Sequence, residues 1–249
     1  MKFIINADDC GYSVHVNEHI KTAIALGHVS STTIMANMND FEGAVEMYKE
    51  SHDRASFGVH LNLTEGMPML ENEELLDYGF YKVENGKMVF NGKDFKHKFL
   101  SKRIQQGIRK ELDTQILKIL DSGVEVSHID GHHHIHTAPF ILPIVIDLAK
   151  HYGIRKIRRV ANTGFKNIKL FQFLWMQYVK SCAKLITPTH FYGFDEFLEI
   201  SKTHNFPSQA TIELMCHPGG KYHPKEENLV LGIDLKERFN AEIINYNEL

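Results

Sequence analysis

A histidine-rich segment from Ser127 to His136, with the sequence SHIDGHHHIH, is the strongest chemical signal in the chain. Neutral imidazole is the commonest nitrogen ligand of divalent metals, so histidines clustered at a strand end indicate a coordination site. Asp130 is placed to fix the tautomer of one imidazole through a hydrogen bond. A solvated polar turn is the alternative. We expect one or two of these histidines to bind metal.

Two adjacent acids, Asp8 and Asp9, directly follow the first apolar run of the chain. Side chains of neighbouring residues at a strand end point in different directions. One carboxylate could therefore bind a metal while the other faces the water to be activated. Both could instead cap the turn before a helix that begins near Val16.

Single histidines occur in two further strand-like segments. His60 lies within FGVHLNL (57–63), where a lone histidine is more often a hydrogen-bonded core residue than a ligand. His217 precedes Pro218 and Gly219, and its ordinary pKa of ~6.5 would let it donate a proton near neutrality. In the alternative interpretation of His217, the Pro-Gly pair shapes a turn and the histidine is incidental.

A basic run, RKIRR at 155–159, lies on a short predicted strand. A solvated face is the simplest interpretation of such a run. One inward arginine could instead orient Asp8, and we assign that role to Arg158. Cys10 and Cys216 flank the same segments without any nucleophile motif, so we interpret them as packing residues.

Apolar runs rich in β-branched residues alternate with segments of helical period along the chain. The predicted strands are 2–7, 32–37, 57–63, 126–130, 155–160, 187–191 and 211–217. The predicted helices are 16–26, 41–50 behind a capping Asp40, 94–120 as two helices, 140–151, 171–185, 195–204 and 233–244. The polar stretch 65–91 is predicted to be a long loop with at most a small hairpin.

This repeated β–α order predicts parallel strands in an open doubly wound sheet or a (β/α) barrel. We favour an α/β fold with a seven-stranded, TIM-barrel-like (β/α) barrel in a single domain, residues 1–249. The carboxyl ends of barrel strands meet on one face, and all four chemical segments lie at or near such ends. Asp9, His60 and one clustered histidine would then offer a carboxylate and two imidazoles, with open positions for water and substrate.

Composition excludes several classes of protein. The chain is 43% hydrophobic and 24% charged, as in ordinary globular proteins. A net charge of -3 gives no broad attraction to nucleic acid or to an anionic membrane. No apolar run approaches the ~20 residues of a membrane span. Acids interrupt any signal-like segment, and the three cysteines have no disulfide framework, so we expect a cytoplasmic protein.

Five segments resemble the signatures of the YdjC-like, or ChbG-like (chitooligosaccharide), carbohydrate deacetylase family. They are Asn6–Gly11, Ser31–Thr33, Gly58–His60, His128–His136 and Cys216–Gly219. Their order and spacing also match, and the resemblance spans nearly the whole chain, more loosely at 65–124 and 161–208. Cys10 departs from the family's usual phenylalanine, which bears on local packing.

The resemblance implies a (β/α) barrel related to polysaccharide deacetylases, with a divalent metal on Asp9, His60 and His132. The family metal is usually magnesium. Ligand chemistry would favour zinc or another transition ion for an Asp-His-His set, because magnesium prefers oxygen, and both metals stay open. His136 is the reserve ligand, since it would share a helical face with His132.

The expected activity is metal-assisted hydrolysis of N-acetyl groups on acetylated mono- or oligosaccharides, with Asp8 as base and His217 as acid. Tyr12 or Phe191 could stack on sugar rings, and a homodimer is possible. Another barrel-type metal-dependent amidohydrolase or phosphoesterase is the first alternative, although those sites usually begin with an HxH pair. A non-catalytic sugar-binding relative is the second, and the presence of both Asp8 and His217 argues against it.

Overall fold

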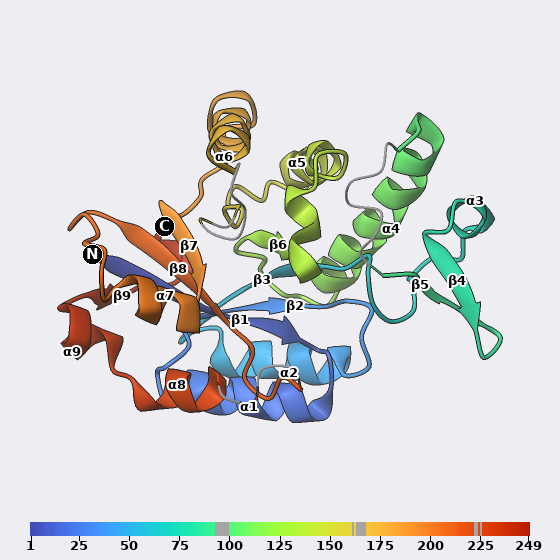
Figure 1. Ribbon diagram of the computed structural model, residues 1–249. Coiled ribbons are helices and arrows are strands. Elements are labelled where there is room, and N and C mark those ends of the chain that lie inside the picture. The colour runs from blue at the N-terminus through green and yellow to red at the C-terminus, as the bar shows by residue number, and fades with distance from the viewer. Residues whose placement is uncertain (93–99, 161, 163–167, 222–223, 225) are drawn as a thin grey trace.

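A curled sheet of parallel strands lies at the centre of the fold (Figure 1). The computed structural model describes residues 1–92, 100–160, 162, 168–221, 224 and 226–249. Over these residues the sheet contains β1 (Lys2–Cys10), β2 (Ser31–Ile34), β3 (Ser56–Leu61), β6 (Ile129–Gly131), β7 (His190–Gly193), β8 (Thr211–Cys216) and β9 (Glu242–Ile243). The order is β6-β3-β2-β1-β8-β7, with β9 paired to the start of β1.

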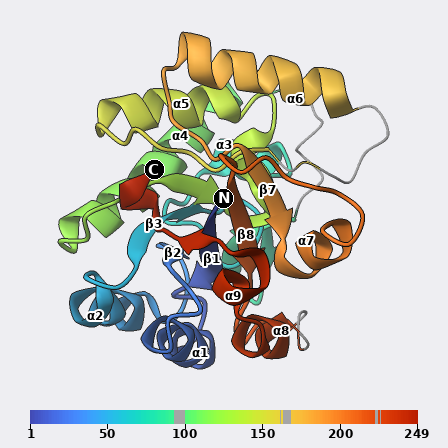
Figure 2. The same ribbon diagram turned by 90° about the vertical axis from the view of Figure 1, so that its left-hand side faces the viewer.

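Helices cover both sides of this sheet. They are α1 (Val14–Ala25), α2 (Phe41–Ser51), α4 (Lys102–Asp121), α5 (Leu142–His151), α6 (Ile168–Gln177), α7 (Phe194–Ile200), α8 (Glu226–Gly232) and α9 (Leu235–Phe239). In Figure 1, α1, α2 and α8 lie below the sheet, and α4, α5 and α6 lie above it. The end-on view in Figure 2 shows these helices arranged around the strands.

The pattern of apolar residues in the strands and helices explains this layering. β1 buries nearly every residue on both of its faces, as parallel strands between helices do. α1 buries Val16, Ile20 and Ala23 at helical spacing, and the Ser13 side chain caps it by accepting a hydrogen bond from the Val16 amide. Apolar side chains from both layers join in one large core.

The sheet forms a half-barrel, and the expected regular closed barrel of seven strands is not found in the described residues. The predicted strand 155–160 is reduced to isolated bridges, Ile129 to Ile157 and Lys156 to Ile186. Two backbone hydrogen bonds link this segment to Ile129 on one side, and two, including Ile157 N to Ile186 O (3.0 Å), link it to Ile186 on the other. Four charged side chains surround one isoleucine here, so there is little apolar surface to hold a longer strand in place.

Other expectations were partly right. The predicted strands at 2–7, 32–37, 57–63, 126–130, 187–191 and 211–217 are confirmed with shifted ends. The loop at 65–91 contains the expected hairpin, β4 (Tyr81–Glu84) with β5 (Lys87–Phe90), and a short helix α3 (Glu73–Asp77). α4 is one helix, and residues 93–99 of the expected pair lie outside the described residues.

The predicted helix 233–244 is confirmed only in its first part, α9 (Leu235–Phe239), and is wrong after that. α9 ends at Phe239 because Asn240 adopts a left-handed backbone (φ 46°), and the chain returns as β9. The helix expected at 171–185 begins earlier and continues from Tyr178 to Cys182 as a π-helix. Asp40 does occupy the N-cap position of α2, but its carboxylate accepts from the Asn17 side-chain amide at 2.7 Å and makes no capping bond.

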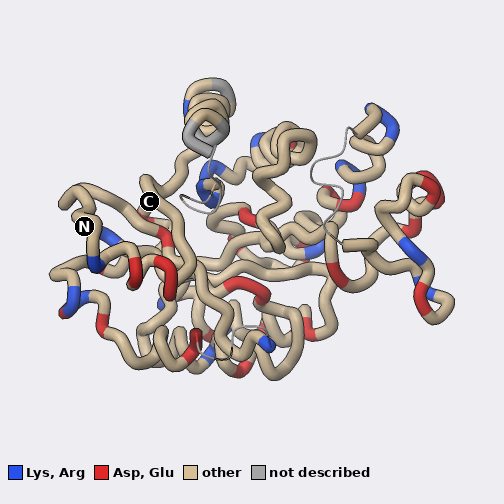
Figure 3. The backbone as a smooth tube through the Cα atoms, in the orientation of Figure 1, with Lys and Arg blue, Asp and Glu red and all other residues tan. Residues whose placement is uncertain are grey.

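Positions of Lys and Arg and positions of Asp and Glu are interspersed along the backbone in Figure 3. None of the helices in the described part of the chain is both long and apolar enough to cross a membrane.

Candidate active site

The carboxyl ends of β1, β3, β6 and β8 surround a cavity of about 450 Å³. Its lining includes all five residues to which the sequence analysis gave metal-binding or proton-transfer roles: Asp8, Asp9, His60, His132 and His217. The other lining residues are Tyr12, Val16, Glu65, His133, His134, Met215, Gly220 and Lys221. Segments separated by more than a hundred residues in sequence thus meet at one edge of the sheet, as the parallel topology requires.

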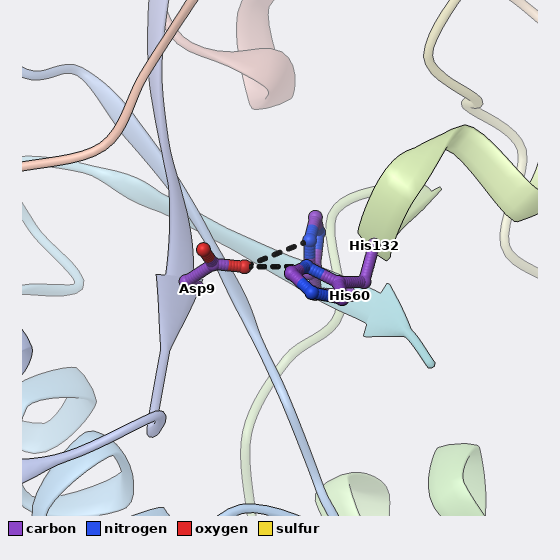
Figure 4. A group of neighbouring side chains, drawn as sticks. All are labelled: Asp9, His60 and His132. Carbon is purple, nitrogen blue, oxygen red and sulfur yellow. Dashed lines mark ion pairs between the residues drawn. The ribbon is translucent and has the colours of Figure 1, made fainter. Parts of the chain in front are cut away.

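Three potential metal ligands converge in this cavity (Figure 4). Asp9 Oδ1 lies 2.9 Å from His132 Nδ1 and 3.3 Å from His60 Nε2. This oxygen is buried, yet it accepts no well-aligned hydrogen bond from any described residue. A buried oxygen facing two imidazole nitrogens, with all three atoms within 4.8 Å of one another, fits a divalent cation.

Unusual backbone geometry aims these ligands. Asp9 has a left-handed backbone (φ 66°), and the β1–β2 register shifts between Ala7 and Cys10. The irregularity turns Asp8 and Asp9 apart, as the adjacent acids suggested. After His132, both His133 (φ 52°) and His134 (φ 58°) are also left-handed. Three such non-glycine residues around one cavity indicate strain retained at a functional site.

A carboxylate contacts each of these two imidazoles on its other nitrogen. Asp130 Oδ1 lies 2.7 Å from His60 Nδ1, and the Thr33 hydroxyl donates to Asp130 Oδ2 at 3.1 Å. Glu65 Oε2 lies 3.1 Å from His132 Nε2. Carboxylate–histidine–metal arrangements of this kind fix the tautomer and ring orientation. They leave Nε2 of His60 and Nδ1 of His132 facing Asp9.

In the absence of a cation, the surrounding carboxylates favour the protonated, imidazolium form of His60. Burial disfavours its imidazolium form, but Asp130 and the two acids of β1 raise the pKa of His60 to about 10. The pKa of Asp9 is well below its usual range despite its burial, because His132 and His60 stabilise the carboxylate. The site therefore favours a positive charge at its centre.

Asp8 belongs to a separate ionic network. Arg158 is fully buried and donates to both carboxylate oxygens of Asp8, at 2.7 and 2.6 Å. The same guanidinium lies 2.8 Å from Asp130 and donates to Glu213 at 2.8 Å. Burial alone would raise the pKa of Asp8, but Arg158 holds it well below the usual range.

This network favours Asp9 over Asp8 as the metal ligand. Asp8, His60 and Asp130 also lie close enough to form a donor set. Both of those carboxylates, however, already contact the positive charge of Arg158. A dication placed there would lie beside a buried cation, which Coulomb repulsion disfavours.

His217 lies at the cavity edge just after β8. Its Nδ1 is 3.0 Å from Glu226 Oε2, and the same oxygen accepts the His217 backbone amide at 3.0 Å. Burial disfavours the imidazolium, but Glu226 and the nearby acids raise the pKa of His217. The ring therefore carries a proton at neutral pH more often than an ordinary histidine.

The remaining sequence candidates agree with expectation only in part. His136 is buried, belongs to none of the donor sets, and neither ring nitrogen hydrogen-bonds to a described residue. Phe191 is buried beneath Arg158, with the guanidinium carbon 4.8 Å from the ring centroid, so stacking on a sugar is wrong for this residue. Tyr12 does line the cavity, and its hydroxyl donates to Glu65 at 2.5 Å. Cys10 and Cys216 are buried, consistent with packing roles.

Sequence reasoning missed Glu65, Glu226 and Glu213. Glu65 could have been found, because it lies four residues after the end of β3 and obeys the strand-end rule that identified the other acids. Glu226 comes from α8, and no spacing rule places it on His217. Glu213 lies inside an apolar strand, where a buried acid indicates a buried cationic partner.

Comparisons with known proteins identify the family that this chain resembles. A family model described as "YdjC-like protein" matches residues 2–242. A carbohydrate deacetylase of Brevibacillus brevis is 32% identical over 227 residues, covering 88% of this chain and 81% of that protein. One from Listeria monocytogenes serotype 4a is 40% identical over 224 residues, covering 88% and 81%. A crystal structure from Enterococcus faecalis, described as a candidate cellobiose-phosphate cleavage protein, superposes with a TM-score of 0.79 at 23% identity, covering 99% of this chain and 98% of that one.

Proposed function

Because the chain belongs to the YdjC-like protein family, we propose that it is a carbohydrate deacetylase, a hydrolase that removes N-acetyl groups from amino sugars. The observation that carries this proposal is the convergence of Asp9, His60 and His132 in one cavity with the ion-paired Asp8 and with His217. Acetyl transfer to water needs an electrophile activator, a proton acceptor and a proton donor, and the cavity offers a candidate for each.

Asp9, His60 and His132 would hold one divalent cation. When bound, such an ion supplies Lewis acidity, which makes water and the acetyl carbonyl more reactive. We propose magnesium on the family resemblance, with zinc or another transition ion as the alternative that the two imidazoles favour. Asp130 and Glu65 support the proposal, because each would keep a ligand imidazole in its binding tautomer.

Asp8 is the proposed proton acceptor for the attacking water. Its carboxylate lines the cavity, is held by two hydrogen bonds from Arg158, and receives a third from the Asn6 side chain at 2.9 Å. These bonds keep the group ionised and oriented. They also weaken it as a base, so it depends on a water already made acidic. Arg158 contributes by positioning.

His217 is the proposed proton donor to the leaving amine. Glu226 fixes its Nδ1, so Nε2 is the nitrogen that would deliver the proton. A phosphoesterase, another amidohydrolase or a non-catalytic sugar-binding protein is less well supported, because the curated relatives are named deacetylases and both proton-transfer groups are present.

The domain boundaries, the location and the oligomeric state are proposed from the sequence and from its resemblance to the family. We propose one catalytic domain over residues 1–249, a cytoplasmic location and a homodimer. The bridges at Ile157 and Lys156 support the interpretation that segment 155–158 completes a seven-segment barrel.

The test of the function is acetate release from a panel of N-acetylated mono- and disaccharides, with and without chelator. We expect release from sugars with N-acetylglucosamine units, its loss with chelator and its return with added divalent metal. A His60→Ala preparation, purified identically, controls for contaminating hydrolases. A folded, metal-supplemented protein that releases no acetate from the panel would refute the proposal. Phosphate release from sugar phosphates would favour the phosphoesterase alternative.

The role of His217 predicts a dependence on the leaving group. An alkyl amine must be protonated to depart, whereas a phenol leaves without help. His217→Ala should therefore lower kcat/KM for an N-acetyl sugar by ~10², the scale of a lost general acid, and affect an aryl acetate much less. Parallel kcat/KM measurements on the two substrates check this prediction, with His151→Ala on exposed α5 surface as the control. Equal losses on both substrates would mean that His217 binds or structures the site instead.

A further inference from the structure

The segment after β9 covers the end of the strands opposite the cavity. It ends in a short 3₁₀ helix, Tyr246–Glu248, and Tyr246 is completely buried. Figure 2 views the molecule from this side and shows the two chain ends close together near the centre. The matched family model stops at residue 242, so Tyr246 lies beyond the region that this chain shares with it.

Tyr246 is held tightly at this position. Its ring stacks on His128 with centroids 3.5 Å apart and planes inclined by 7°. Its amide donates to the Ser56 hydroxyl at 3.0 Å, and its carbonyl accepts from the Lys156 ammonium. Gly58 makes room for the stack, because a Cβ there would lie 2.6 Å from the His128 ring.

A chain of hydrogen bonds runs from Tyr246 to the catalytic cavity. The Tyr246 hydroxyl donates to Glu213 Oε2 at 2.7 Å, and Arg158 Nε donates to Glu213 Oε1 at 2.8 Å. The two terminal nitrogens of Arg158 then donate to Asp8. All four side chains are at most 3% exposed. Low-dielectric surroundings strengthen such a chain and make each unmatched partner costly.

We propose that Tyr246 is a positioning residue for Asp8, acting through Glu213 and Arg158; the consequence for catalysis rests on the proposed deacetylase function. The geometry gives the reason. Arg158 has several carboxylates within reach, including Asp130 at 2.8 Å. Glu213 fixes the Nε edge of the guanidinium, which leaves the terminal pair aligned with both oxygens of Asp8.

The Tyr246 hydroxyl helps to keep Glu213 ionised, so that its carboxylate can fix the Nε edge of Arg158. Burial raises the pKa of Glu213 to about 7, while Arg158 and the tyrosine hydroxyl oppose the rise. Without the hydroxyl, Glu213 is more often neutral and has one fixed contact fewer. The guanidinium then loses a counter-charge on its Nε side. The geometry of its two hydrogen bonds to Asp8 changes as a result.

Tyr246→Phe tests the link, because it keeps the ring that stacks on His128 and removes only the hydroxyl. We expect kcat for acetate release to fall about tenfold, the scale of one hydrogen bond to a charged group, with KM and metal affinity unchanged. Tyr81→Phe is the matched control. Tyr81 is also buried, and its hydroxyl has no hydrogen-bond partner among the described residues.

A double-mutant comparison separates positioning from general stability. If Tyr246 acts only through Asp8, Tyr246→Phe should change the residual rate of an Asp8→Asn enzyme by less than about twofold. An equal loss in both backgrounds would overturn the proposal. Glu213→Gln is the second variant and should show the same dependence on Asp8.

An NMR measurement tests the link without any enzymatic assay. The Arg158 Nε–H signal, assigned with Arg158→Lys, should shift in Tyr246→Phe, and its exchange with solvent should accelerate. An unchanged signal would overturn the proposal, as would unchanged kcat in an active enzyme. A changed signal in a protein that deacetylates nothing would support the link from Tyr246 to Arg158 and count against the proposed function alone.

Discussion

Replacing Asp8 by asparagine should lower kcat for N-acetyl hydrolysis by ~10² or more while leaving the affinity for divalent metal unchanged. Asp8 contacts Arg158 and Asn6, whereas the converging ligand atoms belong to Asp9, His60 and His132. The amide of asparagine keeps the size of the carboxylate but cannot take up a proton from water. Because Arg158 keeps the pKa of Asp8 well below its usual range, the loss should be similar across neutral pH.

Steady-state kinetics and calorimetric metal titration of the same Asp8→Asn preparation check this prediction. Arg158 retains Asp130 and Glu213 as counter-charges, so a thermal unfolding curve should show a folded variant. Asp40→Asn is a suitable control, since Asp40 contacts Asn17 and lies outside the cavity lining. Joint loss of metal and activity would mean that the roles of Asp8 and Asp9 are interchanged.

Much of the candidate site could be predicted because one topological rule governs it. Parallel strands bring their carboxyl ends together whatever the loops do, so Asp8, Asp9 and His60 had to meet. The same rule placed the histidine segment after β6 on this edge. The basic run offered one inward arginine to orient Asp8, and the residue assigned that role, Arg158, is found on Asp8. Their catalytic roles stay predictions.

Side-chain partners that depend on irregular backbone could not be predicted. The reserve-ligand role of His136 assumed a regular helix, in which His132 and His136 share a face. The segment is instead a 3₁₀ turn with left-handed residues at His133 and His134, so that spacing rule fails. The pairing of Glu226 with His217 likewise depends on the path of the chain into α8.

The sequence pattern also could not show that the seventh predicted strand, 155–160, would not form and that the sheet would stay a half-barrel. The run at 155–160 contains the β-branched residues Ile157 and Val160, which suit a strand, but its neighbours on both sides offer only single bridges. Arg158 turns inward to meet three carboxylates. The requirements of this buried charge, rather than β propensity, decide the local geometry.

Removing a metal ligand is the second large effect expected. His60→Ala should lower divalent metal affinity by more than ~10² and abolish activity at micromolar metal, because one of the three proposed protein ligands is lost. Glu65→Gln should weaken binding by only about tenfold, since it alters the partner of His132 and leaves the ligand in place. His151→Ala, on the exposed surface of α5, should bind metal normally. Calorimetry on chelator-treated protein measures all four proteins, wild type included.

The involvement of His60 also predicts how the affinity for divalent metal depends on pH. In the ion-free protein the pKa of His60 is raised to about 10, so the imidazole is protonated at pH 7 and must lose that proton to bind a cation. Metal and proton therefore compete. Affinity should rise with pH, by about tenfold per unit for each proton released, and should fall as the solution is acidified. Titrations in buffers of different ionisation enthalpy would count the protons directly. Affinity independent of pH, or unchanged in His60→Ala, would show that the cation binds elsewhere, with the Glu65–His132–His133 set as the next site to test.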